Sequence, residues 1–93
     1  MEGAVIFGMS HAFYGGATMK NGVTEQANFD SYKLIRIGEA PRRTHVEIVE
    51  SEGPPGGIGE PGVPPVAPAI ANAIFALTGQ RIRSMPFARA GIV

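Results

Sequence analysis

The chain has 93 residues, a net charge of zero from eight basic and eight acidic side chains, and no cysteine. A chain this short forms at most one small domain and buries a smaller fraction of its surface than a typical enzyme. The neutral balance argues against nucleic acid or an anionic membrane as a partner. The lack of cysteine excludes disulfides and thiolate-bound metal sites within the chain.

The first segment has the pattern of a helix. Apolar residues recur at spacings of three and four from Glu2 to Phe13, which predicts a helix with one buried face. Gly3 and Gly8 lie inside it, where each glycine costs roughly 1 kcal/mol relative to alanine. We therefore expect close backbone packing at these glycines or fraying of the helix.

Short extended segments follow. Asn21-Gly22 is a preferred pair for a tight turn with positive φ, so residues 17–28 are predicted to form a β-hairpin. Residues 32–37 favour an extended conformation, and residues 44–50 alternate well enough to predict a strand. A short closing strand is expected over residues 81–87.

The second half contains a long loop and a second helix. Glycine and proline dominate residues 51–65 and exclude both a helix and a hydrogen-bonded β-strand there. Apolar spacing then predicts a helix from Val66 to Thr78, ended by Gly79. Asn72, a polar residue in this helix, is expected to bond the backbone of the glycine-rich loop.

These elements predict an α+β fold in a single domain over residues 1–93. Two helices would pack on a small, mainly antiparallel sheet of three or four strands, with the Gly/Pro-rich loop outside.

The loop contains a glycine pattern that resembles a nucleotide site. Gly57-x-Gly59-x-x-Gly62 has the spacing of the dinucleotide-binding fingerprint. However, Glu60 would place a carboxylate where the pyrophosphate must lie, and Pro61 removes an N–H donor. This interpretation is rejected.

Three other interpretations of the loop stay open. Pro61-x-x-Pro64 is a polyproline ligand pattern, but such ligands usually carry a nearby cation and none occurs between Glu50 and Arg81. The loop could also be an ordinary stiffened surface connection. In the third, the glycines let a bulky cofactor approach the backbone while the prolines hold Glu60, the only ionisable residue between Glu52 and Arg81, as a general base.

A family resemblance favours the third interpretation. The run Gly59-Glu60-Pro61-Gly62-Val63-Pro64-Pro65 and its continuation to Phe75 resemble the C-terminal signature of molybdenum hydroxylase large subunits, the xanthine dehydrogenase and aldehyde oxidase family. The isoquinoline 1-oxidoreductase β subunit and aldehyde dehydrogenase branch is the most similar. Further familial segments stand in the same order along nearly the whole chain: Met1-Glu2-Gly3, Ile6-Phe7-Gly8, Lys20-Asn21-Gly22, residues 26–32 and Val46-Glu47-Ile48-Val49-Glu50-Ser51.

The resemblance implies a function and a site. The chain would be the C-terminal part of a molybdenum-cofactor-binding region, in an enzyme that hydroxylates an N-heterocycle or oxidises an aldehyde with oxygen from water. Glu60 matches the family's catalytic base, and Gly57, Ile58 and Gly59 match the stretch beside the molybdopterin cofactor. No metal ligand is expected from this chain, because His11 and His45 have no carboxylates at ligand spacing and are expected to face solvent.

The resemblance also implies missing parts. In the family most cofactor-binding loops lie upstream of the position of Met1, and iron–sulfur clusters lie on another domain or subunit. The expected partners are therefore the remainder of the molybdenum-binding subunit and an iron–sulfur subunit, with a small N-heterocycle or aldehyde as substrate. The chain alone is expected to be inactive and cytoplasmic, although a longer parent could be periplasmic. The alternative is a non-catalytic interaction module, or the remnant of a truncated gene, that self-associates.

Overall fold

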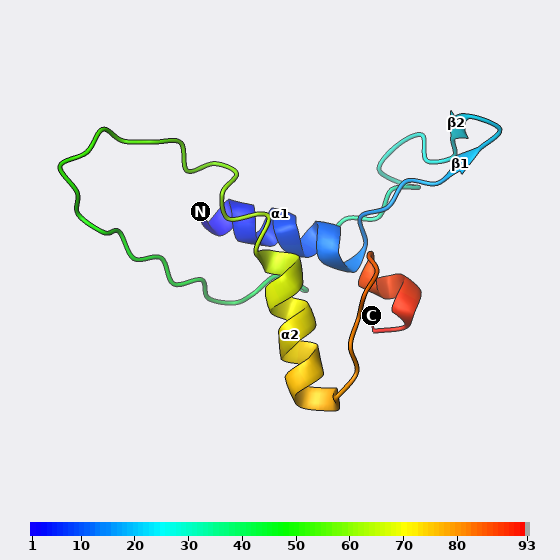
Figure 1. Cartoon of the computed structure of the whole chain (residues 1–93). Coiled ribbons are helices and arrows are strands. Elements are labelled where there is room, and N and C mark those ends of the chain that lie inside the picture. The colour runs from blue at the N-terminus through cyan, green and yellow to red at the C-terminus, as the bar shows by residue number, and fades with distance from the viewer. Residues whose placement is uncertain (93) are drawn as a thin grey trace.

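The structure is a computed structural model that describes residues 1–92 (Figure 1). Its elements in chain order are helix α1 (Glu2–Phe13), strands β1 (Met19–Lys20) and β2 (Val23–Thr24), helix α2 (Val66–Thr78) and a 3₁₀-helix η1 (Phe87–Ala90). Both predicted helices are confirmed with the bounds that the sequence indicated. The chain between β2 and α2 makes a wide excursion without regular secondary structure (Figure 1).

Helix α1 packs against the start of α2 through its small residues. Ala4, Gly8 and Ala12 are buried on one face, and a Cβ added to Gly8 would lie 2.8 Å from Cγ2 of Val66. The expected close packing is therefore confirmed at Gly8. It does not occur at Gly3, where an added Cβ would meet nothing within 4 Å.

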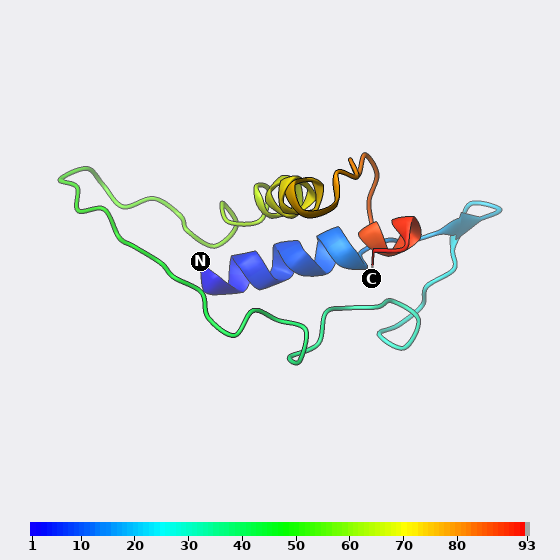
Figure 2. The same ribbon diagram turned by 90° about the horizontal axis from the view of Figure 1, so that it is seen from below.

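Helix α2 crosses α1 steeply, and Figure 2 shows it nearly end-on beside α1. It ends as predicted at Gly79, which has a φ of 73° and donates its N–H to the carbonyl of Phe75 at 2.8 Å. The small core lies where α1, α2 and η1 meet. Its buried apolar side chains are those of Ala4, Ala12, Val66 and Phe87, and the Phe87 ring packs edge-on against Phe13 with centroids 6.0 Å apart.

The hairpin is confirmed but lies away from this core. β1 and β2 pair antiparallel, with Met19 opposite Thr24 and Lys20 opposite Val23. Asn21 and Gly22 at the turn have φ values of 50° and 77°, as the sequence pair predicted. All four strand residues are exposed, and the hairpin projects from the helices (Figure 1).

The α+β class and a small antiparallel sheet are confirmed, but the predicted third and fourth strands and the packing of the helices on the sheet are wrong. In residues 1–92 the only sheet has two strands, and the helices pack on each other rather than on a sheet. Residues 32–37, 44–50 and 81–87 form no strand, because an extended segment becomes a strand only beside a hydrogen-bonding neighbour. The last of these segments instead leads into η1.

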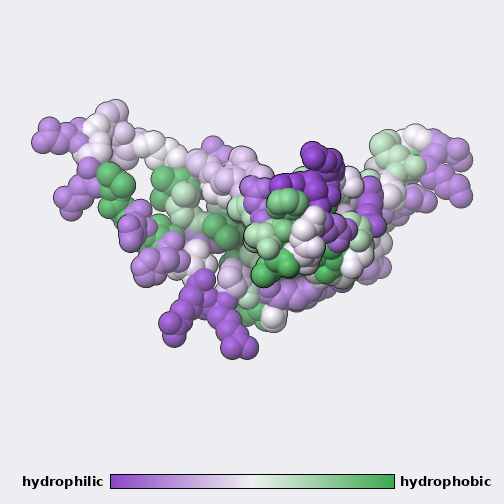
Figure 3. Space-filling view, turned by 60° about the horizontal axis from the view of Figure 1, so that its bottom comes forward, coloured by the Kyte–Doolittle hydropathy of each residue, from purple (hydrophilic) through white to green (hydrophobic). Residues whose placement is uncertain are grey.

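The chain is more open than an ordinary protein of its size. Its radius of gyration is 15.9 Å, compared with about 12 Å for a compact chain of this length. It exposes 7366 Å², whereas a folded monomer of 9.8 kDa exposes about 5,200 Å². Large apolar side chains remain on the surface, including those of Phe29, Ile37, Ile48 and Val49, and Figure 3 shows hydrophobic residues among polar ones along the projecting loop.

Candidate functional site

Glu60 lies where the long loop returns to the helices. Its carbonyl accepts the N–H of Val63 at 2.9 Å, which closes a turn just before α2. Gly62 in this turn is buried against α1, and a Cβ added there would lie 2.9 Å from Cβ of Ala4. The backbone beside Glu60 is therefore anchored, because only glycine permits this approach to α1.

Glu60 itself is exposed to solvent beside this anchored turn. Its only hydrogen bond in residues 1–92 is the one accepted by its carbonyl. No other ionisable side chain occurs between Glu52 and Arg81. The carboxylate is thus available to a group that this chain does not contain.

Gly57, Ile58 and Gly59 form the strip of backbone that leads to Glu60. A Cβ added to Gly57 or Gly59 would meet nothing within 4 Å, and the N–H groups of all three residues lack a backbone acceptor in residues 1–92. The Ile58 side chain is 66% exposed. The four residues singled out in the sequence therefore make one continuous, open edge.

Two open hollows adjoin this edge. One, of about 520 Å³, is lined by Met1, Glu2, residues 46–49 and Ile58. The other, of about 920 Å³, lies inside the loop and is lined by residues 48–56 and Ile58. The structure thus brings the first residues of α1 and the extended segment 46–49 to the same place as Ile58, a juxtaposition that the sequence analysis missed.

The open edge fits one side of a bulky heteroaromatic cofactor. Unbonded N–H groups can donate to ring heteroatoms, and two residues without side chains leave space for close approach. Within residues 1–92 no three His, Asp or Glu side chains gather as metal ligands, and His11 and His45 are both exposed, as expected.

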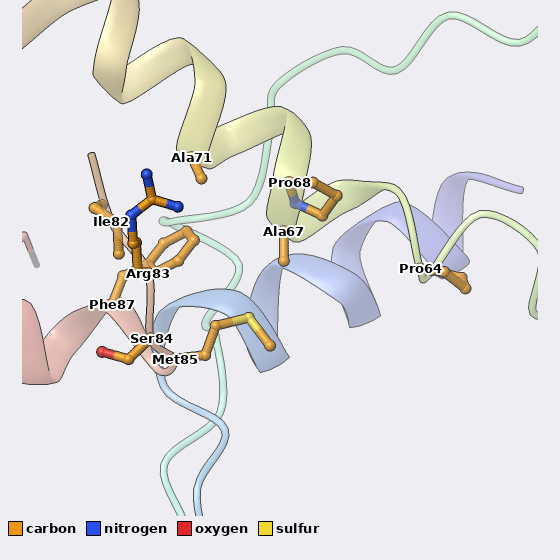
Figure 4. Close-up of a pocket in the computed structure, with 9 residues that line it drawn as sticks. All are labelled: Pro64, Ala67, Pro68, Ala71, Ile82, Arg83, Ser84, Met85 and Phe87. Carbon is orange, nitrogen blue, oxygen red and sulfur yellow. The ribbon is translucent and has the colours of Figure 1, made fainter. Parts of the chain in front are cut away.

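A third hollow lies between α2 and the C-terminal segment (Figure 4). It measures about 600 Å³ and is mostly apolar, with Arg83 as its one charged residue; its other lining residues are Pro64, Ala67, Pro68, Ala71, Ile82, Ser84, Met85 and Phe87. None of the predicted site residues lines it. No local pattern predicts this groove, because it depends on how residues 81–87 return along α2.

The expected role of Asn72 is wrong. Its Oδ1 accepts a hydrogen bond from Nη1 of Arg81 at 2.9 Å, and the Arg81 guanidinium lies 3.6 Å from the centroid of the Phe75 ring. Asn72 therefore ties the segment after α2 back to the helix. It does not contact the glycine-rich loop.

A polar cluster at the end of α1 was also missed. The Tyr14 hydroxyl donates to Oε1 of Glu39, and Nζ of Lys33 lies 4.0 Å from the centroid of the Tyr14 ring. This hydrogen bond raises the pKa of Tyr14 and lowers the pKa of Glu39. A separation of 25 residues left no pattern in the sequence.

Comparison with known proteins decides the family. No model of a known family matches the chain. It is 37% identical over 86 residues to the isoquinoline 1-oxidoreductase β subunit of Brevundimonas diminuta. The matched region covers 92% of this chain and 11% of that protein. It is also 37% identical over 92 residues to a membrane-bound aldehyde dehydrogenase (pyrroloquinoline-quinone) of Gluconacetobacter polyoxogenes. That match covers 99% of this chain and 12% of the relative.

The chain is similar to these two oxidoreductases over nearly its whole length. The resemblance seen in its sequence to the xanthine dehydrogenase and aldehyde oxidase type is thereby confirmed. The chain spans only about a tenth of the length of these relatives. One of them is named as a β subunit. In residues 1–92 no helix has both the length and the apolar character needed to cross a bilayer.

Proposed function

We propose that this chain supplies the catalytic-base loop of a molybdopterin-dependent oxidoreductase that acts on an N-heterocycle or an aldehyde. The observation that carries the proposal is the position of Glu60. It is the one carboxylate on an open glycine edge, its backbone is anchored through Gly62 to α1, and its side chain has no partner in residues 1–92. A base must be held in place and yet remain free to accept a proton.

Each residue of the edge has a role in this proposal. The N–H groups of Gly57, Ile58 and Gly59 bind the rim of the cofactor, and the apolar Ile58 side chain excludes water beside it. Glu60 accepts a proton from the water that provides the oxygen of the product. The molybdenum cofactor, when bound, supplies the two-electron oxidation.

Other polypeptides must complete the site. The edge covers one side of a cofactor, and the relatives are about eight times as long as this chain. We infer that the remainder of a molybdenum-binding subunit encloses the cofactor and substrate, and that an iron–sulfur subunit takes the electrons. In this assembly residues 1–93 form the C-terminal part of the cofactor-binding region. The chain alone is inactive and, as it stands, cytoplasmic.

Substitution of Glu60 in the assembled enzyme tests the proposal. Glu60→Gln keeps the size of the side chain but removes its basicity, so kcat should fall by about 10² to 10⁴-fold while the cofactor content is unchanged. Glu52→Gln removes the other carboxylate of the loop and serves as the matched control, with activity close to the original. Equal activity of both variants would sink the role of Glu60 as the base.

The cofactor is a separate point, because the Gluconacetobacter relative is named for pyrroloquinoline quinone. Metal analysis and quinone extraction of the complex purified from its host distinguish the two. Molybdenum with a pterin supports the proposal, and bound quinone without molybdenum rejects it. Isolation of the chain alone, with neither group, would favour the second candidate, a non-catalytic interaction module, which the large exposed apolar surface supports.

A further inference from the structure

Residues 42–50 have no regular secondary structure, and Arg42 lies at a bend. Residues 43–45 line a hollow with α1 and α2, and residues 46–49 line another with the first residues of α1. The sequence of residues 44–50 has the alternation of a strand, yet no backbone N–H or carbonyl of residues 42–50 takes part in a backbone hydrogen bond in residues 1–92. Val46 is 45% exposed and Ile48 is 89% exposed. Figure 1 shows this segment, in green, leaving from behind the helices and forming one arm of the wide loop. A free edge of this kind is a template for strand pairing.

The charges of the segment are ordered along it. Arg42, Arg43 and His45 stand in its first half, and Glu47 and Glu50 stand in its second half. Two copies that run antiparallel would place the basic half of each beside the acidic half of the other. Opposite charges across a strand pair are favourable, and like charges directly opposite are unfavourable. The segment is therefore complementary to itself in the antiparallel direction only.

We propose that two copies of this chain pair through residues 42–50 as an antiparallel two-stranded ladder centred on Val46. Such an interface has twofold symmetry, so that every cross-strand contact away from the axis occurs twice. The opposed residues are Val46 with Val46, Thr44 with Ile48, His45 with Glu47, and Arg42 with Glu50. Val46 and Ile48 then lie on one face, whereas Val49 lies on the other face opposite Arg43, and no like charges stand directly opposite each other.

Two further properties of the chain suit this pairing. It exposes roughly 2,000 Å² more than a folded monomer of its mass, and a standard interface needs only about 800 Å² from each partner. Its net charge is zero, so no overall repulsion opposes association of two copies. The apolar side chain of Met1, beside the segment, can add to the contact.

A charge exchange on the full chain tests both the pairing and its register. Arg42→Glu would set like charges opposite each other twice, and so would Glu50→Arg, so each variant should weaken the dimer by at least about tenfold in sedimentation at low salt. The double variant R42E/E50R restores opposite charges and should bring the dimerisation constant back to near its original value. Lys20→Glu on the exposed hairpin changes the net charge as Arg42→Glu does and should leave the dimer intact.

Hydrogen exchange locates the contact. Amides of residues 43–49 should gain protection as the protein concentration rises, while those of α2 should not change. A monomer at every concentration overturns the proposal, as does a dimer that withstands both single variants or leaves these amides unprotected. A monomer whose segment becomes protected only when a longer subunit of the family is added would assign the free edge to that subunit instead.

Discussion

The helix pair and the long loop use glycine in opposite ways. Where the two helices meet, Gly8 of α1 and Gly62 in the turn before α2 are buried, and a Cβ at either position would lie within 3 Å of a neighbouring side chain. In the loop, Gly56, Gly57 and Gly59 are exposed, and a Cβ there would meet nothing within 4 Å. Glycine in the first region is explained by packing inside the chain. In the second region only turn formation or an outside group can require it, and none of these three residues has a positive φ.

The largest effect is expected from filling the helix contact. Gly8→Val should lower the free energy of unfolding by about 2–3 kcal/mol, because the new side chain would overlap Val66 and the carbonyl of Val63. The loss should exceed what valine gains over glycine in helix propensity. Thermal or urea unfolding followed by circular dichroism measures the change.

Gly3→Ala in the same helix is the control. An added Cβ meets nothing there, so this variant should gain about 0.5–1 kcal/mol from the higher helix propensity of alanine. If both variants were destabilising to a similar extent, the contrast between buried and open glycines in α1 would be wrong.

The two regions also differ in how far the sequence predicted them. Helices α1 and α2 and the turn at Asn21-Gly22 follow from signals within a few residues: apolar spacing, a C-terminal glycine and a turn pair. Residues 44–50 carry an equally local strand pattern, but a strand also needs a neighbour, and residues 1–92 provide none. The contact of Gly62 with Ala4, which anchors the turn beside Glu60, joins residues far apart in sequence and had no local signal.

Two serines allow a comparison between a segment that is hydrogen-bonded to α1 and the glycine-proline loop. Ser10 is buried in α1, and its Oγ accepts the N–H of Ile35 at 3.1 Å. Ser51 is exposed in the loop, and its Oγ accepts the N–H of Gly53 at the same distance. Ser10→Ala should cost about 1–2 kcal/mol of unfolding free energy, because a partly buried N–H loses its acceptor. Ser51→Ala should change it by less than about 0.5 kcal/mol, because water replaces the exposed acceptor.

Urea unfolding of the two serine variants provides the measurement. Equal losses of unfolding free energy in the two variants would mean that the hydrogen bond from Ile35 to Ser10 does not stabilise the contact of the segment after the hairpin with α1.

The smallest expected effect concerns the exposed pair of Tyr14 and Glu39, which lies at the end of α1 remote in sequence from the loop. The hydrogen bond lowers the pKa of Glu39 below its ordinary value of 4.5, so its contribution to stability is present above that pH and is lost as the pH falls through the lowered pKa. The same bond raises the pKa of Tyr14 above 10.0, so its contribution is present below pH 10 and is lost as the pH rises through the raised pKa. Glu39→Gln removes the carboxylate and should shift the ultraviolet titration of Tyr14 to lower pH, with Tyr14→Phe identifying which of the two tyrosines is responsible. An unchanged titration would mean that the hydrogen bond between Tyr14 and Glu39 does not form in solution. Residues 33–39 would then not be held to the end of α1 by this bond.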